Sequence, residues 1–291
     1  MALLSRILVP VEFSPRCMGS AQYAEALARH FHCELVFLHV VRPPFTPYTA
    51  PDVMAYSNAI DLGADMQQQA RTWLEAFLAG RFNSNRVAQE VLEGDPARTI
   101  VEYARDGGFD LIVMPTHGYG PFRRFLLGSV TAKVLHDAAC PVWTGPHMET
   151  APAYDSLEFR KILCAIDLEP ESRAVLGWAG AFAQEFSGEL HIVHAIATSE
   201  RRAGGWSFDP DWRADVSRRA RGSIEQLQNE LQTPGDVSIE IGEPPEAIRE
   251  AAGRLGADLV VIGRGRPGLL GRLRTNAYAI LRESPCPVVA I

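Results

Sequence analysis

The chain has 291 residues, of which 47% are hydrophobic, a formal net charge of −7 and a pI of about 5.7. This length supplies one large core or two modest ones, and the negative charge argues against a general electrostatic hold on nucleic acid. No apolar run approaches the roughly 20 residues of a membrane span, and the N-terminus is too short for a signal-peptide core. We therefore expect a cytoplasmic protein without membrane or nucleic-acid partners.

The first half of the chain alternates short β-branched runs with amphipathic stretches. The runs predict strands near residues 6–12, 34–41, 86–92, 110–115 and 140–144. The stretches between them predict helices at 17–31, 64–79, 96–106 and 129–138. Strands that are apolar on both faces and separated by helices indicate a parallel sheet covered on both sides.

The second half repeats the first in the same order. Residues 6–12 match 161–167, and Cys140-Pro-Val matches Cys286-Pro-Val. The repeat predicts further strands near 160–166, 189–196, 236–242, 258–263 and 286–291, and helices at 171–186, 211–231, 245–255 and 275–283. A period this long indicates duplicated domains, which we place at 1–146 and 159–291 with a linker at 147–158. The predicted fold class is α/β, with two tandem doubly wound five-stranded parallel sheets of strand order 3-2-1-4-5.

The loop before the fourth helix of the first half carries glycines suited to an anion. Gly118 is followed nine residues later by Gly128 and Ser129, at the start of the helix. Glycine lets the backbone approach a phosphate, and the amides that open a helix supply donors and partial positive charge. Arg123 and Arg124 offer countercharge in the same loop. It is not a Walker A loop, because no Gly-Lys-Ser/Thr follows.

Topology brings this loop to the end of the first strand. In an open parallel sheet, ligands bind beyond the carboxyl ends of the strands where strand order reverses, here between strands 1 and 4. Glu12 stands at the end of strand 1 and could accept hydrogen bonds from a ribose or a base edge. Alternatively, it caps the helix after Ser14 or faces solvent. Asp167 holds the same place in the second half, and His39 and His194 match late in strand 2, which suggests a shared structural role.

Taken together and in order, these motifs resemble a universal stress protein domain. The run 7–14, the loop with Gly118, Gly128 and Ser129, and the final Cys-Pro-Val carry the resemblance, which covers nearly the whole chain as two tandem domains. One branch of that family binds ATP through such a loop. The resemblance implies ATP or a related adenine nucleotide, with Mg²⁺, in the first domain. It implies as the nucleotide site Glu12, Val40, Met114, Thr116, Gly118, Gly128, Ser129 and Val130. It also implies that both sheets are of the adenine nucleotide alpha hydrolase-like kind and that the domains pair through their fifth strands.

Two positions of the first domain depart from the family pattern. Pro115 replaces the first glycine of the motif, and Glu12 replaces the usual aspartate. Proline has no N–H, so a hydrogen bond from that position is lost, at about 0.5–1.5 kcal/mol or up to roughly tenfold in affinity. Such a loss alone weakens a micromolar site without abolishing it.

The loop of the second domain departs further. Gly263 restores the first glycine, but Arg274 and Thr275 stand where the first domain has Gly128 and Ser129. The arginines at 264, 266, 272 and 274 could bind a smaller anion or pair with carboxylates of the partner domain. We do not expect ATP in the second half.

The function that follows is a stress-response or signalling protein that binds an adenine nucleotide with little or no hydrolysis. No nucleophile elbow, HExxH or Rossmann signature is present, and His117 fits a loop histidine better than a catalytic one. The alternative is a pseudo-dimeric scaffold or interaction protein that binds no nucleotide, and a weaker third option is an anion sensor that uses the arginine loop. The long proline-rich connection at 42–61 is either a lid or a packed surface loop. Whether two chains form a homodimer stays open.

Overall fold

The computed structural model describes residues 3–43, 53–82, 86–116, 127–145, 148, 157–197, 210–265 and 275–291. Its strands follow the apolar runs of the sequence and are buried on both faces near the middle of the sheet. They are β1 (Arg6–Pro10), β2 (Glu34–Val41), β3 (Val87–Glu93), β4 (Leu111–Val113), β5 (Val142–Thr144), β6 (Lys161–Ala165), β7 (Glu189–Ile196), β8 (Asp236–Ile241), β9 (Leu259–Ile262) and β10 (Val288–Ala290).

Helices fill the connections between successive strands within each half. They are α1 (Pro15–Phe31), α2 (Val53–Leu78), α3 (Pro96–Asp106), α4 (Ser129–Asp137), α5 (Ser172–Glu185), α6 (Pro210–Leu231), α7 (Pro244–Leu255) and α8 (Thr275–Glu283). Local chemistry sets several boundaries. Ser14 caps α1 by accepting a hydrogen bond from the Cys17 amide, and Asp95 caps α3 through the Arg98 amide. Each cap precedes a proline in the first turn, where the missing N–H has no helical partner to lose.

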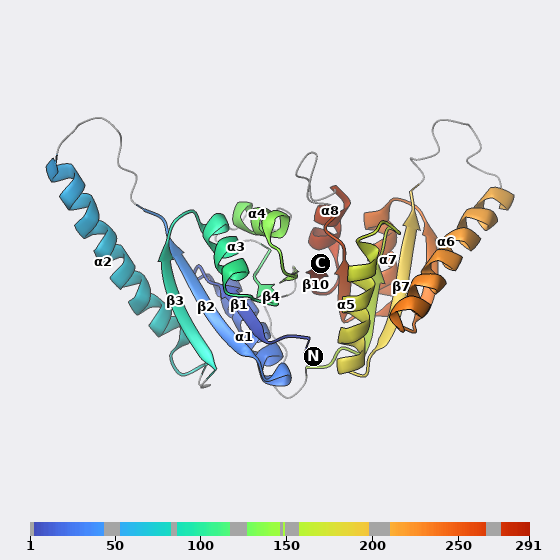
Figure 1. The fold of residues 1–291 in the computed structure, drawn as a ribbon, viewed down its shortest axis with the longest axis horizontal. Helices are drawn as coiled ribbons and strands as arrows, with labels where there is room; N and C mark the ends of the chain where they lie inside the picture. The colour runs from blue at the N-terminus through green and yellow to red at the C-terminus, as the bar shows by residue number, and fades with distance from the viewer. Residues whose placement is uncertain are drawn as a thin grey trace.

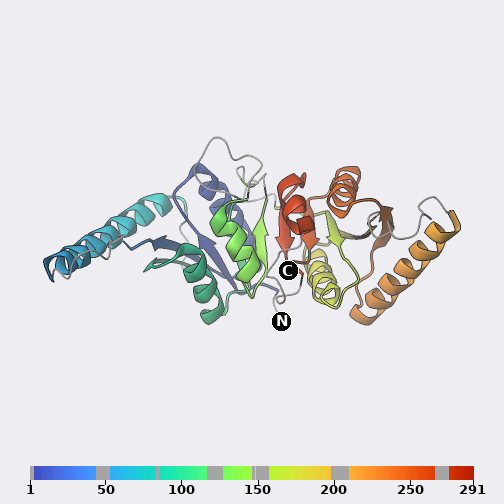
Figure 2. The ribbon, with the colours of Figure 1, turned by 90° about the horizontal axis from the view of Figure 1, so that it is seen from above.

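All the strands form one sheet with the order β3-β2-β1-β4-β5-β10-β9-β6-β7-β8. Each half has the order 3-2-1-4-5, and its strands pair in parallel. The predicted fold class is therefore confirmed. The halves meet where β5 pairs with β10 in the antiparallel sense, with Trp143 opposite Val289. Figures 1 and 2 show the two halves side by side, with α2 and α6 at the outer ends.

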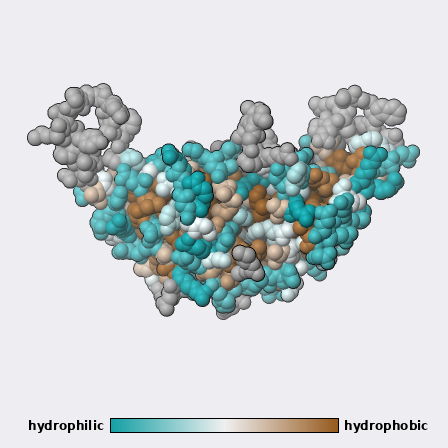
Figure 3. All heavy atoms as spheres, in the orientation of Figure 1, coloured by the Kyte–Doolittle hydropathy of each residue, from teal (hydrophilic) through white to brown (hydrophobic). Residues whose placement is uncertain are grey.

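Two hydrophobic cores cover the two faces of the sheet, and both cross from one half into the other. Ile7 and Val9 of β1 point into the core under α1, α2, α5 and α6, whereas Leu8 between them points into the core under α3, α4, α7 and α8. This alternation is the period-2 pleat of a strand covered on both sides. In the described part of the chain, Trp73 and Ile241 are the exposed large hydrophobic residues, and polar residues dominate the face seen in Figure 3.

Helix α2 begins earlier than the sequence predicted. The prediction treated residues 42–61 as a connection and began the helix at 64, but α2 starts at Val53. The prolines that favoured a loop all precede this point, and residues 53–62 contain neither proline nor glycine, so nothing in them stops a helix. The remainder of the connection, residues 44–52, and most of the expected linker at 147–158 lie outside the described residues. None of the helices in the described ranges is long and apolar enough to cross a membrane.

Candidate functional site

A cavity of about 590 Å³ opens at the carboxyl ends of β1, β2 and β4 in the first half. Its floor is formed by the end of β1 and by the end of β2, its far wall by the residues after β4, and its rim by α3 and α4. The cavity lies between β1 and β4, where strand order reverses, which is the binding position of doubly wound sheets. Its volume falls in the range of small-molecule sites.

The structure brings most of the predicted site residues to this cavity. The lining includes Glu12, Val40, Met114, Gly128, Ser129 and Val130. Thr116 is buried beside the cavity, and its carbonyl accepts a hydrogen bond from the Gly128 N–H at 2.8 Å. That bond joins the two ends of the glycine loop. Gly118, like His117, Arg123 and Arg124, lies outside the described residues.

The start of α4 presents donors to the cavity. Gly128 is the N-cap, with an extended backbone (φ −63°, ψ 146°), and Ser129 is the first helical residue. The N–H groups of a first helical turn have no acceptor within their own helix. The amides of Ser129 and Val130 therefore offer hydrogen bonds and the positive end of the helix dipole at the cavity wall, the arrangement that binds phosphate groups.

Glu12 has a local hydrogen-bond role as well as a place in the cavity. Its Oε1 accepts a hydrogen bond from the Ser14 Oγ at 2.7 Å, and its N–H donates to the Cys17 Sγ at 3.3 Å. Ser14, rather than Glu12, caps α1. The turn that places Glu12 includes Phe13 with φ 65°, a left-handed conformation uncommon for a non-glycine residue. Leu168 repeats that conformation beside Asp167 in the second half, so both domains use the same turn.

The matching histidines have the structural role that the sequence suggested. His39 Nδ1 lies 2.8 Å from the carbonyl of Val11, and His194 Nδ1 lies 2.9 Å from the carbonyl of Ile166. Each histidine thus ties the end of strand 2 to the residue after strand 1. This confirms the shared role and fixes the floor of the cavity in both domains.

Among the lining residues that sequence reasoning missed, three carry polar or ionisable side chains. Thr131 donates its hydroxyl hydrogen bond to the carbonyl of Pro115 at 3.0 Å and so holds α4 against the end of β4. Cys17 lines the wall, where burial raises the pKa of its thiol to about 11, so it is neutral at physiological pH. Arg42 follows β2 at the rim. Of the three, only Thr131 could have been found from the sequence, because it lies in the first turn of the helix after the glycine loop. The places of Cys17 and Arg42 at the cavity depend on tertiary packing.

Several charged side chains lie together near the rim of the cavity. Asp95 accepts a hydrogen bond from the Arg98 amide and lies 3.4 Å from Lys133 Nζ. The hydrogen bond from Arg98 and the charges of Lys133 and Arg42 hold the pKa of this carboxyl below its ordinary value. Asp95 therefore stays ionised at neutral pH and pairs with Lys133 beside the cavity.

The equivalent cavity of the second half is smaller, at about 390 Å³. Asp167 lines it, but its Oδ1 accepts hydrogen bonds from the Glu169 N–H and from the Ser172 Oγ. Arg264, at the start of the arginine loop, has partners in the first half of the chain. Among the described residues, its guanidinium donates to three main-chain carbonyls, those of Leu135, Ala138 and Cys140. Arg266, Arg272 and Arg274 lie outside the described residues.

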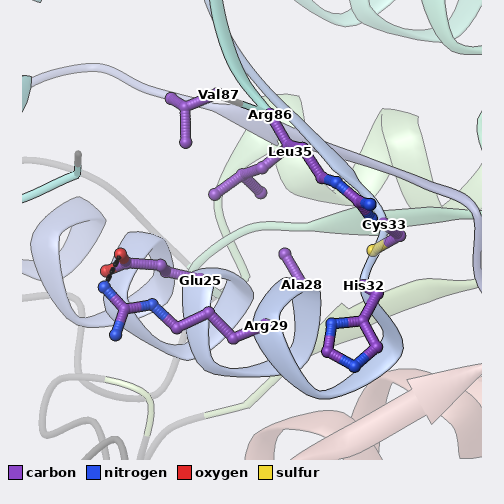
Figure 4. Close-up of a pocket in the computed structure, with 8 residues that line it drawn as sticks. All are labelled: Glu25, Ala28, Arg29, His32, Cys33, Leu35, Arg86 and Val87. Carbon is purple, nitrogen blue, oxygen red and sulfur yellow. Dashed lines mark hydrogen bonds and ion pairs between the residues drawn. The ribbon is translucent and has the colours of Figure 1, made fainter. Parts of the chain in front are cut away.

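A third cavity, of about 370 Å³, lies at the amino ends of the strands in the first half (Figure 4). Leu35 and Val87, near the starts of β2 and β3, form one wall, and α1 forms the other. Glu25 pairs with Arg29 at 2.8 Å across the helical turn. Ligands of doubly wound sheets bind at the carboxyl ends of the strands, so this cavity at the amino ends is not the candidate site.

The comparisons with known proteins agree on one family. The model of the universal stress protein family matches residues 4–144 and again 158–291. A universal stress protein of Methanocaldococcus jannaschii is 31% identical over 143 residues, which are 48% of this chain and 81% of the relative. One of Mycolicibacterium smegmatis is 24% identical and covers 98% of this chain and 96% of its own length. The crystal structure of a universal stress protein from Archaeoglobus fulgidus superimposes with a TM-score of 0.68 at 23% identity, over 98% of this chain and 97% of its own.

Proposed function

This chain belongs to the universal stress protein family, and we propose that its N-terminal domain binds ATP or a related adenine nucleotide in a stress-response or signalling role. The observation that carries this proposal is the 590 Å³ cavity, whose lining combines the start of α4 with the residues that end β1 and β2. The second domain lacks the glycine and serine that begin α4. We therefore assign a single nucleotide site to each chain.

Each part of the cavity suits one part of a nucleotide. The amides of Ser129 and Val130 and the Ser129 hydroxyl would hold the phosphates, with Gly128 allowing close approach. The main chain at Val40 and the carboxylate of Glu12 would contact the base or ribose. Within the described residues, no group of three or more His, Cys, Asp and Glu side chains could hold a metal ion. We propose that Mg²⁺ arrives with the phosphates, as its preference for phosphate oxygens and water allows.

Hydrolysis should be slow or absent. A general base must lie within hydrogen-bond reach of the water that it activates. Glu12 is the carboxylate among the described lining residues, and its Oε1 already accepts the Ser14 hydroxyl. This arrangement favours a protein that responds to nucleotide binding over one that consumes nucleotide.

A specific observation favours a second candidate, a scaffold that binds no nucleotide. The β5–β10 pairing joins two domains, which we place at 1–146 and 159–291, into one continuous sheet. Such an internal pseudo-dimer closes two sheet edges that would otherwise invite aggregation. Under this alternative the cavity binds no nucleotide, and the paired domains act by binding other proteins through their surfaces.

Mass spectrometry of small molecules released by denaturing freshly purified protein tests the proposal. We expect one adenine nucleotide per chain, or, if it is lost on purification, a rise in melting temperature with millimolar Mg-ATP, because a ligand of the folded state stabilises it. The Gly128 variants described below provide the control. Finding no nucleotide and no rise in melting temperature would favour the scaffold.

Substitution of Pro115 tests whether the departure from the family pattern weakens binding. Pro115→Gly and Pro115→Ala both restore an N–H, and we expect each to lower the dissociation constant for Mg-ATP by up to about tenfold. Isothermal titration calorimetry measures the change. A gain with glycine alone would show that the ring and Cβ, and not the missing N–H, limit binding. No gain from either variant would show that Pro115 fits the site as it stands.

A further inference from the structure

Arg264 occupies a position that joins the two domains. It follows β9 by two residues, and its N–H donates to the carbonyl of Ile291, at the end of the neighbouring β10, at 3.1 Å. Because β10 pairs with β5, this bond holds the start of the second domain's loop at the seam between the halves. From there the side chain reaches residues more than a hundred positions away in sequence.

The guanidinium ends at the C-terminus of α4 in the first domain. Nη1 donates to the carbonyls of Leu135 at 3.3 Å and Ala138 at 2.8 Å, and Nη2 donates to the carbonyl of Cys140 at 3.1 Å. The last four carbonyls of a helix lack partners within the helix, and a cation at this end interacts favourably with its dipole. The planar fork of arginine presents donors on two terminal nitrogens in fixed directions and so spans carbonyls that lie apart, whereas the three donors of lysine all radiate from one nitrogen.

The guanidinium of Arg264 is largely buried, so its hydrogen bonds to the carbonyls matter for stability. The surroundings lower the pKa of the Arg264 guanidinium from its ordinary value through desolvation, but arginine remains charged at neutral pH. A buried charge that lost its carbonyl partners would carry a desolvation penalty. The three carbonyls therefore hold Arg264 in place, and Arg264 in turn fixes the final turn of α4.

The other end of the same helix forms the wall of the candidate site. Gly128, Ser129 and Val130 at its start line the cavity, and Thr131 bonds to Pro115. A nine-residue helix is about 13.5 Å long, and its backbone hydrogen bonds link the last turn to the first. A residue that fixes its C-terminus therefore also fixes the direction in which its first amides point.

The two domains differ at this position. Thr116 of the first domain aligns with Arg264, and its short side chain is buried beside its own loop. The second domain therefore has Arg274 and Thr275 where the first has Gly128 and Ser129, and it has an arginine that contacts α4 where the first has Thr116.

We propose that Arg264 is a positioning residue for the cavity of the first domain, through which the second domain sets the orientation of the α4 amides. Its effect on ligand affinity rests on the proposed nucleotide function, whereas its effect on α4 does not. The second domain therefore serves as a structural part of the first domain's site instead of binding a ligand through this arginine.

Two readouts on the full chain test this role. For Arg264→Ala we expect amide hydrogen exchange in α4 to accelerate at least tenfold, while exchange in α1 stays unchanged, and the dissociation constant for Mg-ATP to rise about three- to tenfold. Arg264→Lys keeps the charge but loses the fork, so its exchange in α4 should be intermediate. Arg254→Ala is the matched control, since it removes an arginine of the same domain that pairs with Glu240 at the surface.

Unchanged exchange in α4 of Arg264→Ala would overturn the proposal, and so would an acceleration spread evenly over the first domain. If Arg264→Ala does not fold, Arg264→Lys decides by the same two readouts. A wild-type protein that binds no Mg-ATP would contradict the proposed function, yet the exchange measurement would still decide the role of Arg264.

Discussion

Replacing Gly128 with aspartate should raise the dissociation constant for Mg-ATP about a hundredfold while leaving the fold intact. Gly128 is the N-cap of α4 with a backbone that any residue adopts, and aspartate is among the best N-cap residues. The added carboxylate would lie at the cavity wall, where we propose that the phosphates bind. Two unit charges of like sign about 5 Å apart at an effective dielectric near 20 repel by about 3 kcal/mol, which corresponds to roughly a hundredfold in affinity. Calorimetric titration measures the loss.

Gly128→Asn separates charge from size. Asparagine has nearly the same shape as aspartate and caps a helix equally well, so it adds the same bulk without the charge. We expect a much smaller loss of Mg-ATP affinity, together with equal melting temperatures for the two variants in the absence of nucleotide. Adenosine, which has no phosphates, should not distinguish them. Equal losses with aspartate and asparagine would contradict a phosphate site at this position.

Truncation of Trp143 to alanine should lower the free energy of unfolding by about 3–5 kcal/mol. Trp143 lies in β5 at the seam and is fully buried. Its ring packs against Tyr23 of the first domain and against Phe159 and Phe182 of the second, with centroids 5.5–5.7 Å apart. Its removal leaves a cavity between the domains. Urea denaturation monitored by circular dichroism gives the change.

Trp143→Phe provides the comparison, because the buried indole Nε1 has no hydrogen-bond partner among the described residues. An unsatisfied buried donor costs about 1–3 kcal/mol. Phenylalanine removes this donor and keeps most of the ring, so we expect a loss below about 1.5 kcal/mol. A loss as large as that of the alanine variant would show that Nε1 contributes to stability after all, through a partner that the static structure does not contain.

Much of the fold follows from local patterns that the sequence displays. Runs such as residues 34–41 are apolar on both faces, so they predict buried parallel strands, and the internal repeat predicts the second domain from the first. The predicted start of α2, residue 64, was wrong by about three turns of helix, since prolines earlier in the connection outweighed a segment without any helix breaker. Local composition can predict that a helix exists better than it predicts where the helix begins.

The candidate site was predictable where motif and topology act together, and not elsewhere. The rule for strand order placed Glu12 and Gly128 at one cavity, and both line it. The bond between Thr131 and Pro115, and those of Arg264 to the end of α4, join residues that only the folded chain brings together. For Arg264 the sequence offered a cluster of arginines, which suggested anions or carboxylates. That Arg264 would instead donate to main-chain carbonyls could not be predicted without knowing how the two halves pair.

The pairing of β5 with β10 within one chain also allows the two halves to carry different substitutions on either side of the seam. In a dimer of identical chains, one substitution appears on both sides of the seam, so gaining an arginine such as Arg264 would also mean losing Thr116. A tandem chain escapes this constraint, because Gly128 and Ser129 can persist in one half while the other half diverges. The covalent link also makes the association intramolecular, so it does not depend on protein concentration. Dilution, which separates two identical chains, leaves these unlike halves paired one to one.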